Sequence, residues 1–363
     1  MYWPGEHSYE RSHERVTHIE IAKRLAALKG YESIRTFDRA THAPGPVYFL
    51  PSDTLTSVAE AKALGIRGEH DLFGGVVPYP FVATKIITHP LLSPDADAPV
   101  GWSAEIGRQI QNVVLRGFSA FSHADANQAG LHLFKHGPVR IKSVRESGGR
   151  GQAVVHNAAE LEKVLDAVDP AELSQCGLVL EEDLTDVTTR SVGQVRVAEL
   201  VASYWGTQRL TLDNGGALVY GGSELTVVPG GFNTLLGFDL PDAVWLAVVQ
   251  ACAYDAAATA CFPSFFASRR NYDIVQGLDW RGRPRSGVLE QSWRVGGASS
   301  AEIAALEAFR AAPGLPSIRA TCVEVYGESE IPPSNATVYF RGLDERVGFI
   351  TKYTLVEGHG NTR

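Results

Sequence analysis

Cysteine is scarce in this chain of 363 residues, and its four cysteines are widely spaced. No two of them form a CxxC pair, so the sequence indicates neither a structural zinc site nor a disulfide framework. The eleven histidines are scattered as well, without an HExxH motif or another paired spacing. We therefore expect Cys176, Cys252, Cys261 and Cys322 to be buried, reduced side chains.

Long apolar runs are also missing, since none approaches the roughly 18–20 residues of a membrane span. The N-terminal segment is polar and mixed in charge, which is unlike a signal peptide. We expect a cytoplasmic protein that has no membrane partner. Basic residues are outnumbered, with 33 Lys and Arg against 41 Asp and Glu, and this balance disfavours nucleic acid as a partner. An anionic small molecule can still bind where a few Arg and Lys gather.

The chain is long enough for two or three domains, at roughly 100–200 residues each. Residues 1–30 are expected to form an N-terminal arm and a helix that ends at Gly30. Residues 31–115 are predicted to be a small α/β domain, in which a buried strand at 46–50 leads through a turn into a helix. The polar segment 93–99, SPDADAP, is the best candidate for a linker.

The rest of the chain, residues 116–363, has an α+β pattern, with a first part at about 122–185 and a second part at about 186–363. The first part is predicted to contain, in order, a helix at about 122–136, strands at 138–143 and 152–156, a helix at 158–168 and a strand at 177–181. In the second part, β-rich runs surround the hairpin turn DNGG. Its later elements are predicted to be a helix at about 242–261, strands at 272–276 and 287–291, a helix at 301–311 and two terminal strands.

The segment PVRIKSVRESGGRGQAVV carries the strongest chemical signal. Its first strand ends in Lys142, and the glycine-rich loop that follows contains Arg150 and returns into a second strand. Glycines leave backbone N–H groups free to surround phosphate oxygens, while a lysine on a strand supplies a fixed positive charge. The loop does not fit the Walker pattern GxxxxGK[ST]. A phosphate-binding hairpin is the favoured interpretation, and a plain hairpin turn is the alternative.

The segment LVLEEDL, residues 178–184, is an apolar strand that ends in consecutive carboxylates. Adjacent like charges repel unless they are solvated or used in binding. Such a strand, if it connects two domains, could offer backbone groups to the edge of an adenine and a carboxylate to a ribose. Taken alone, a strand that runs out into solvent is the simpler interpretation.

A third segment, from ASRRNYDIV to LEQSWRVGG, places Asp273 in one strand and Glu290 in the next, across a hairpin. Cross-strand neighbours come within about 5 Å of each other. Carboxylate oxygens at that separation suit magnesium, which commonly also binds substrate phosphates. Arg269, Arg270 and Arg294 are near these carboxylates in the sequence and could clamp phosphoryl oxygens. A surface network of salt bridges is the alternative.

These motifs, in this order, resemble the ATP-grasp superfamily. Its lysine with a glycine-rich loop, acidic hinge strand, Asp and E-x-N-x-R strand are matched by IKSVRESGGRGQ, VLEEDL, NYDIV and LEQSWRVGG. The RVGG ending resembles the peptide-ligase branch. The whole chain also resembles a bacterial family with an ATP-grasp-like core, through GFSAFS, SYWGTQRLT, YGGS and ASRRNYD, and that resemblance names no substrate.

The resemblance implies an α+β ATP-grasp fold, in which two subdomains clasp ATP, preceded by a small α/β domain. Lys142 would contact the α and β phosphates of ATP. The adenine and ribose would be held by Glu181, Glu182 and the backbone near Leu184. The β and γ phosphates would be covered by the loop of Gly148, Gly149, Arg150 and Gly151.

The same resemblance implies that Asp273, Glu290 and Ser292 bind Mg²⁺ and that Arg294 stabilises the transferred phosphoryl group, with Arg269 and Arg270 beside it. The chain departs from the family pattern at three points. Ser292 stands where the family has a metal-ligating Asn, and Asp279 is an alternative to Asp273 as the first ligand. The early nucleotide-contacting Lys of many members has no clear counterpart near Ser122 and His123, and a capping or surface role is favoured for His123.

We expect a ligase that uses ATP to turn a small-molecule carboxylate into an acyl phosphate, which an amine or a thiol then attacks. A kinase acting on a small molecule is the first alternative. A nucleotide-binding protein without catalysis is the second, since Ser292 and the missing Lys leave the catalytic set incomplete. The sequence leaves the oligomeric state open, and a homodimer is one possibility that it allows.

Overall fold

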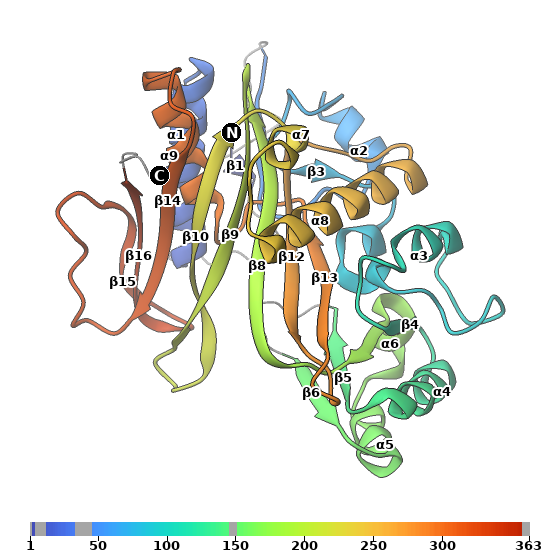
Figure 1. Ribbon diagram of the computed structural model, residues 1–363. Coiled ribbons are helices and arrows are strands. Elements are labelled where there is room, and N and C mark those ends of the chain that lie inside the picture. Colours follow the sequence, from blue (N-terminus) through green and yellow to red (C-terminus); the bar gives the residue numbers. More distant parts are fainter. Residues whose placement is uncertain (1, 4–11, 33–45, 145–150, 358–363) are drawn as a thin grey trace.

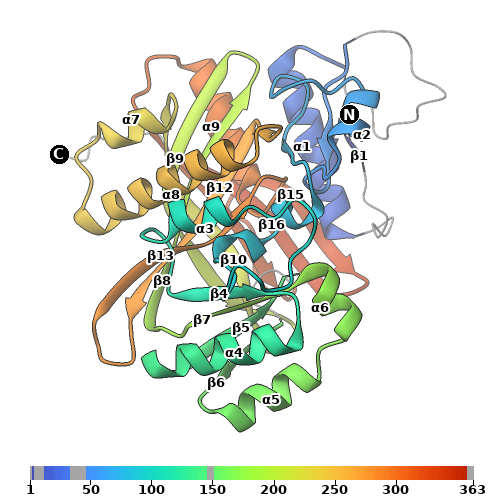
Figure 2. The ribbon, with the colours of Figure 1, turned by 90° about the vertical axis from the view of Figure 1, so that its right-hand side faces the viewer.

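The computed structural model describes residues 2–3, 12–32, 46–144 and 151–357 (Figures 1 and 2). Within these residues two antiparallel sheets, one of four strands and one of eight, form the framework of the molecule. The smaller sheet lies at the bottom of Figure 2, with helices on its outer side. The larger sheet rises beside it and carries helices on both faces (Figure 1).

The small sheet has the strand order β4-β7-β5-β6, and every neighbouring pair is antiparallel. Its strands are β4 (Gly117–Ala120), β5 (Val139–Ser143), β6 (Gln152–Val155) and β7 (Leu178–Glu182). It is covered by α4 (His123–Leu133) and α5 (Ala158–Asp166), and α6 (Pro170–Cys176) leads into β7. The predicted helices and strands of this part are confirmed, with ends that differ by a few residues.

Local chemistry explains these helices. Asn157 caps α5, because its side chain accepts the backbone N–H of Glu160. Leu161 and Leu165 lie one turn apart on α5, and both are buried against the small sheet. The short helix α6 was not predicted from the sequence, although Asp169 caps it and Pro170 begins it.

The large sheet has the strand order β13-β12-β8-β9-β10-β14-β16-β15. Its strands are β8 (Thr185–Val197), β9 (Leu200–Leu212), β10 (Leu218–Pro229), β12 (Arg269–Leu278), β13 (Pro284–Ser292), β14 (Ile318–Tyr326), β15 (Thr337–Asp344) and β16 (Gly348–Glu357). The predicted DNGG turn is confirmed, because Asp213 accepts the backbone N–H groups of Gly215 and Ala217 between β9 and β10. Two terminal strands were predicted, and three are present. The pattern of β15 hides it, since most of its side chains are exposed or only half-buried.

Helices cover both faces of the large sheet. Neighbouring residues of a strand point to opposite faces, so Tyr204 and Trp205 of β9 contribute to two different hydrophobic clusters. On one face lie α7 (Phe232–Leu236) and α8 (Asp242–Cys261), and on the other lie α1 (His13–Lys29) and α9 (Ser299–Ala311). Helix α1 ends as predicted at Gly30, which adopts a left-handed conformation with φ 68°.

The expectation that no apolar run has the length of a membrane span is wrong for α8. Among the described residues, α8 is the one helix that is long and apolar enough to cross a membrane by length and composition. Val248, Ala251 and Tyr254 of this helix are fully buried, and α8 packs on β8, β12 and β13. Burial of one face in the protein core accounts for this composition, because a core helix passes the same test.

The segment 46–115 links the two sheets. It contains β2 (Leu50–Pro51), β3 (Gly75–Val76), α2 (Val58–Ala63), the 3₁₀ helices η1 (Pro80–Ala83) and η2 (Lys85–Thr88), and α3 (Ala104–Ile110). The strand predicted at 46–50 is reduced to β2, which pairs with β1 (Tyr2–Trp3), while β3 pairs with β11 (Phe266–Ala267). Isolated bridges join Leu91 to the small sheet and Val114 to the large sheet.

Candidate functional site

A cavity of about 1590 Å³ is lined by both sheets. The small sheet supplies residues of β5, β6 and β7, and the large sheet supplies residues of β8, β9, β12 and β13. One end of the cavity extends to α1, β14 and β16. The cavity brings together most of the predicted site residues, namely Lys142, Glu181, Glu182, Leu184, Arg269, Asp273, Glu290, Ser292 and Arg294.

On the small sheet, Lys142 of β5 pairs with Glu181 of the neighbouring strand β7, with 2.5 Å between Nζ and Oε1. Both side chains are buried, and Glu181 also meets His89 Nε2 at 3.1 Å. Burial acts to raise the pKa of Glu181, but the charge of Lys142 and the contact with His89 outweigh it and lower the pKa to about 2. The carboxylate is therefore ionised and holds the Lys142 ammonium in place.

Glu182, the last residue of β7, anchors the junction between the two sheets. Its Oε1 accepts Nε and Nη2 of Arg285 on β13, at 3.0 and 2.6 Å, and the backbone N–H of Arg116 at 3.0 Å. These contacts join β7 of the small sheet to β13 of the large one. Both carboxylates that the sequence singled out on this strand therefore already have protein partners.

On the large sheet, Asp273 and Glu290 are directly opposed in the β12–β13 pair. Burial, and then the negative charge of Glu290, raise the pKa of Asp273 to about 6. Lys85 of η2 meets Glu290 with 3.0 Å between Nζ and Oε2. Two carboxylates held this close, and partly buried, form a site with high affinity for positive charge.

Asp273 is supported by neutral hydrogen-bond donors. The amide Nδ2 of Asn271 donates to its Oδ1 at 2.9 Å, and the Ser191 hydroxyl lies 3.3 Å from the same atom. Gln208 Nε2 donates to Ser191 at 3.1 Å. Asn271, Ser191 and Gln208 all line the cavity. The sequence analysis did not connect them with Asp273, because they lie on three different strands.

Arg269 lines the cavity, but its guanidinium is committed to the protein. It forms a two-point ion pair with Glu302 of α9, with distances of 2.9 Å from Nε to Oε2 and 2.8 Å from Nη2 to Oε1. Its Nη1 donates to the Ser292 hydroxyl at 3.2 Å and to the Arg294 carbonyl at 2.6 Å. Only 2% of Arg269 is exposed. It therefore positions the end of β13.

Arg270 lies apart from the other predicted catalytic residues. Neighbouring residues on β12 face opposite sides of the sheet, so Arg270 points away from the face that carries Arg269 and Asp273. Its guanidinium pairs with Asp255 of α8 at 2.8 Å and with Glu69 at 2.9 Å. Arg270 does not line the cavity.

Arg294 lies at the end of the cavity that reaches α1 and β16. Its side chain is 39% exposed, and its nearest acidic partner is the exposed Asp53, at 3.6 Å. Lys352 of β16 lies nearby and contacts Glu324 at 2.9 Å and His13 Nδ1 at 3.2 Å.

Two histidines of α1 face this end of the cavity and are neutral at pH 7. Burial, and then the charge of Lys352, lower the pKa of His13 to about 4 and that of His18 to about 3. Arg294 also lowers the pKa of His18. The positive charges of Lys352 and Arg294 therefore both lower the pKa of His18.

A small apolar cluster lies where the two sheets meet. It consists of Leu115, Leu184 and Val275, with Leu289 packed against them. All four side chains line the cavity. Their apolar surface suits a flat, apolar ring, and Leu184 is the member that the sequence identified.

The remaining predicted residues lie elsewhere. Gly148, Gly149 and Arg150 are outside the described residues, while Gly151 accepts the backbone N–H of Ser143 at 3.0 Å and leads into β6. The alternative metal ligand Asp279 lies in the turn between β12 and β13. Its carboxylate accepts the backbone N–H groups of Arg281 and Arg283. Asp279 is therefore engaged in the turn and does not line the cavity.

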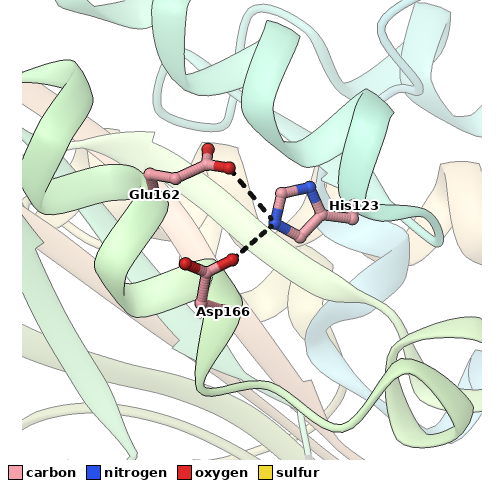
Figure 3. A group of neighbouring side chains, drawn as sticks. All are labelled: His123, Glu162 and Asp166. Carbon is pink, nitrogen blue, oxygen red and sulfur yellow. Dashed lines mark ion pairs between the residues drawn. The ribbon is translucent and has the colours of Figure 1, made fainter.

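A second cluster of metal-type ligands lies on the surface (Figure 3). His123 of α4 is 3.9 Å from Glu162 and 3.6 Å from Asp166, both of α5. All three side chains are 44% exposed or more, and none lines the cavity. His123 therefore has a surface position next to the capping residue Ser122, in line with the role favoured from the sequence.

Two contacts with the charged groups come from the segment 85–89, where Lys85 meets Glu290 and His89 meets Glu181. Nothing in the sequence pointed to them, because the surrounding stretch 71–91 is interrupted by Gly and Pro and lies far along the chain from Glu181 and Glu290. Together the two side chains connect the acidic groups of both sheets to one short stretch of chain.

Two antiparallel sheets around a cavity, with a lysine on one and opposed carboxylates on the other, define an ATP-grasp fold. Solved structures of this class match nearly the whole chain. The synthetase of N5-carboxyaminoimidazole from Staphylococcus aureus, complexed with ADP, matches with a TM-score of 0.55 at 11% identity, over 99% of this chain and 93% of that one. Biotin carboxylase from Campylobacter jejuni matches with a TM-score of 0.53 at 12% identity, over 98% and 87%.

Phosphoribosylamine–glycine ligase from Thermotoga maritima matches with a TM-score of 0.50 at 15% identity, over 98% of this chain and 91% of that one. At these identities the likeness is one of fold. The chain belongs to the family described as "Protein of unknown function (DUF3182)", whose model matches residues 3–354. No curated protein sequence matches it.

Proposed function

We propose that the protein is an ATP- and Mg²⁺-dependent ligase that joins a carboxylate to an amine. A carboxylate oxygen would attack the γ-phosphorus of ATP, releasing ADP and forming an acyl phosphate. The amine nitrogen would then attack the acyl carbon and expel phosphate, leaving an amide. The main support for the proposal is that Lys142 of the small sheet and the Asp273–Glu290 pair of the large sheet line the same cavity.

The nucleotide fits the part of the cavity where the sheets meet. Leu115, Leu184, Val275 and Leu289 offer an apolar slot for the adenine. Lys142 faces the same cavity, and its ammonium is oriented by the ion pair with Glu181. A lysine ammonium has three N–H donors, so the contact with Glu181 leaves donors for phosphate oxygens.

The donor set of the large sheet fits magnesium. Asp273 and Glu290 are carboxylates, the oxygen ligands that Mg²⁺ prefers, and they are held in register by the β12–β13 ladder. Burial, and then repulsion from Glu290, raise the pKa of Asp273, and a divalent cation would remove that repulsion. When bound, the metal would neutralise charge on the phosphoryl oxygens during transfer.

The carboxylate substrate fits the end of the cavity near Arg294, Lys352 and α1. Arg294 has weak acidic competition, from an exposed Asp53 at 3.6 Å. His13 and His18 are neutral and supply ring nitrogens without adding charge. This end is therefore suited to a small carboxylate whose activated group points toward the phosphates. A cytoplasmic location is part of the proposal.

The test is a screen of small carboxylates combined with amines, in which ADP and free phosphate are both measured. We expect both products to appear in equal amounts when the two correct substrates are present. Glu290→Gln should lower turnover by roughly 100-fold, since it removes one preorganised charge at the phosphoryl group. Asp279→Asn is the matched control, because Asp279 is an acid of the same hairpin outside the cavity.

Unchanged turnover in Glu290→Gln would contradict the metal role. ADP formed without free phosphate would identify a kinase, the first alternative, because the phosphoryl group would then stay on the product. ATP binding without turnover under any substrate mixture would favour the non-catalytic alternative.

A further inference from the structure

Four side chains form a square on the cavity face of β12 and β13. Asp273 is paired with Glu290, and Asn271 is paired with Ser292. All four line the cavity. Two corners are carboxylates, and the other two, Asn271 and Ser292, are the candidates for a third oxygen ligand.

The Ser292 corner is already occupied by a cation. Arg269 Nη1 donates to the Ser292 hydroxyl oxygen at 3.2 Å and also to the Ser292 carbonyl at 3.2 Å. Glu302 holds this guanidinium in place from the other side. A positive charge fixed against a hydroxyl oxygen disfavours that oxygen as a ligand for a second cation.

The Asn271 corner has a hydrogen-bond conflict that a metal would resolve. The Tyr204 hydroxyl lies 2.9 Å from Asn271 Oδ1 and 2.6 Å from Glu302 Oε1. A hydroxyl has one proton, so it can serve only one of these two acceptors. Glu302 is the stronger acceptor, because it is the carboxylate of an ion pair and makes the shorter contact.

A half-turn of the Asn271 amide about the Cβ–Cγ bond removes the conflict. Nδ2 would then donate to the Tyr204 oxygen, while Tyr204 donates its proton to Glu302. Asn271 Nδ2 now lies 2.9 Å from Asp273 Oδ1 and donates to it. The same rotation would put the amide oxygen of Asn271 in the place of this Nδ2. Two oxygens facing each other at this distance repel, unless a cation lies between them.

We propose that Asn271, and not Ser292, is the third protein ligand of the divalent cation, and that cation binding is coupled to this rotation of its amide. The proposal rests on the metal role given above to Asp273 and Glu290. In the family pattern the metal-ligating amide stands at the position of Ser292, on the second strand of the hairpin. Here the amide ligand would be Asn271, on the first strand. Tyr204 and Glu302 are then positioning residues, since they act on the metal through Asn271.

The test measures divalent binding directly, with Mn²⁺ as the probe and the free Mn²⁺ signal in electron paramagnetic resonance as the readout. Full-length protein without nucleotide is titrated, so the result does not depend on turnover. Asn271→Ala should weaken Mn²⁺ binding by roughly tenfold or more, and Ser292→Ala by less than about threefold. Thermal unfolding followed by circular dichroism shows that each variant is folded.

Asn271→Asp separates a ligand from a structural role, and it also serves if Asn271→Ala fails to fold. An aspartate cannot donate to Asp273 but can ligate a cation, so Mn²⁺ should bind this variant at least as tightly as the native protein. Weak binding to Asn271→Asp, or a larger loss from Ser292→Ala than from Asn271→Ala, would overturn the proposal. Native protein that binds neither Mn²⁺ nor ATP would instead overturn the proposed function itself.

Discussion

Replacing Asp273 with asparagine should stabilise the ligand-free protein above pH 7. The native side chain is ionised there, although it is partly buried and directly opposed to the negative charge of Glu290. Asparagine has nearly the same shape, and its Oδ1 still accepts the hydrogen bond from Asn271. The substitution therefore removes an unfavourable charge while it keeps the local contacts.

The magnitude follows from the pKa of Asp273. The carboxyl has an ordinary pKa of 3.8 and a pKa of about 6 in the folded protein, and this difference corresponds to about 3 kcal/mol. The folded pKa is raised, so the folded state binds more protons than the unfolded state between these two values. The native protein therefore gains stability as pH falls from about 6 to 3.8. The advantage of the variant should be about 3 kcal/mol at pH 8 and under about 1 kcal/mol at pH 4.

Urea unfolding at the two pH values measures this difference in the free energy of unfolding. Glu290→Gln provides a comparison, because it removes the same repulsion but also the ion pair with Lys85, and its gain should be smaller. Added Mg²⁺ should stabilise the native protein and leave Asp273→Asn unchanged, since only the former binds the ion. A variant that is less stable at pH 8, or equally favoured at both pH values, would refute the argument that burial and repulsion destabilise the ionised carboxylate.

Three further predictions concern the assigned roles and the packing of the fold. Lys142→Met should cost roughly 3–5 kcal/mol in urea unfolding, because it leaves Glu181 buried without its ammonium, and adding Glu181→Leu should recover most of the loss. Arg270→Met should lower the melting temperature without changing ATP affinity in calorimetry, whereas Arg294→Met should leave the melting temperature within a few degrees and reduce turnover. Gly193→Ala should lower the free energy of unfolding in urea by about 1–3 kcal/mol, because a Cβ there would collide with the buried ring of Tyr204 and the backbone carbonyl of Arg270. An unchanged unfolding midpoint would show that the strand can shift.

Strand periodicity and turn chemistry made most of the fold predictable, but they did not fix which residues of β12 and β13 face each other. The register shifts between Asp273 and Ile274, where Ile274 is paired with Val288. Without this irregularity Asp273 would oppose Leu289, and Glu290 would turn to the other face of the sheet. A bulge of this kind has no sequence signature, so the opposition of the two carboxylates could be proposed from the sequence but not established.

Some other features of the site could have been predicted from the sequence, and others could not. Alternation alone separates Arg270 from Arg269 and Asp273 on one strand, so this separation could have been predicted from the sequence. Lys85 and His89 were not, because they reach Glu290 and Glu181 from a segment without regular periodicity. Contacts of this range depend on how the linking segment packs between the sheets, and nothing local in the sequence records it.

Both sheets carry a charge that ATP and magnesium could use, and each charge is already balanced within its own neighbourhood. Lys142 is paired with the buried Glu181, and Glu290 is paired with Lys85. The two pairs differ in what a ligand would do to them. The Lys142–Glu181 pair is buried and can accept a phosphate through the remaining ammonium protons without separating. The Lys85–Glu290 contact competes directly with a cation for Glu290. Lys85→Met should therefore tighten Mn²⁺ binding in the absence of nucleotide, and a variant that bound Mn²⁺ more weakly would show that Lys85 only supports the fold.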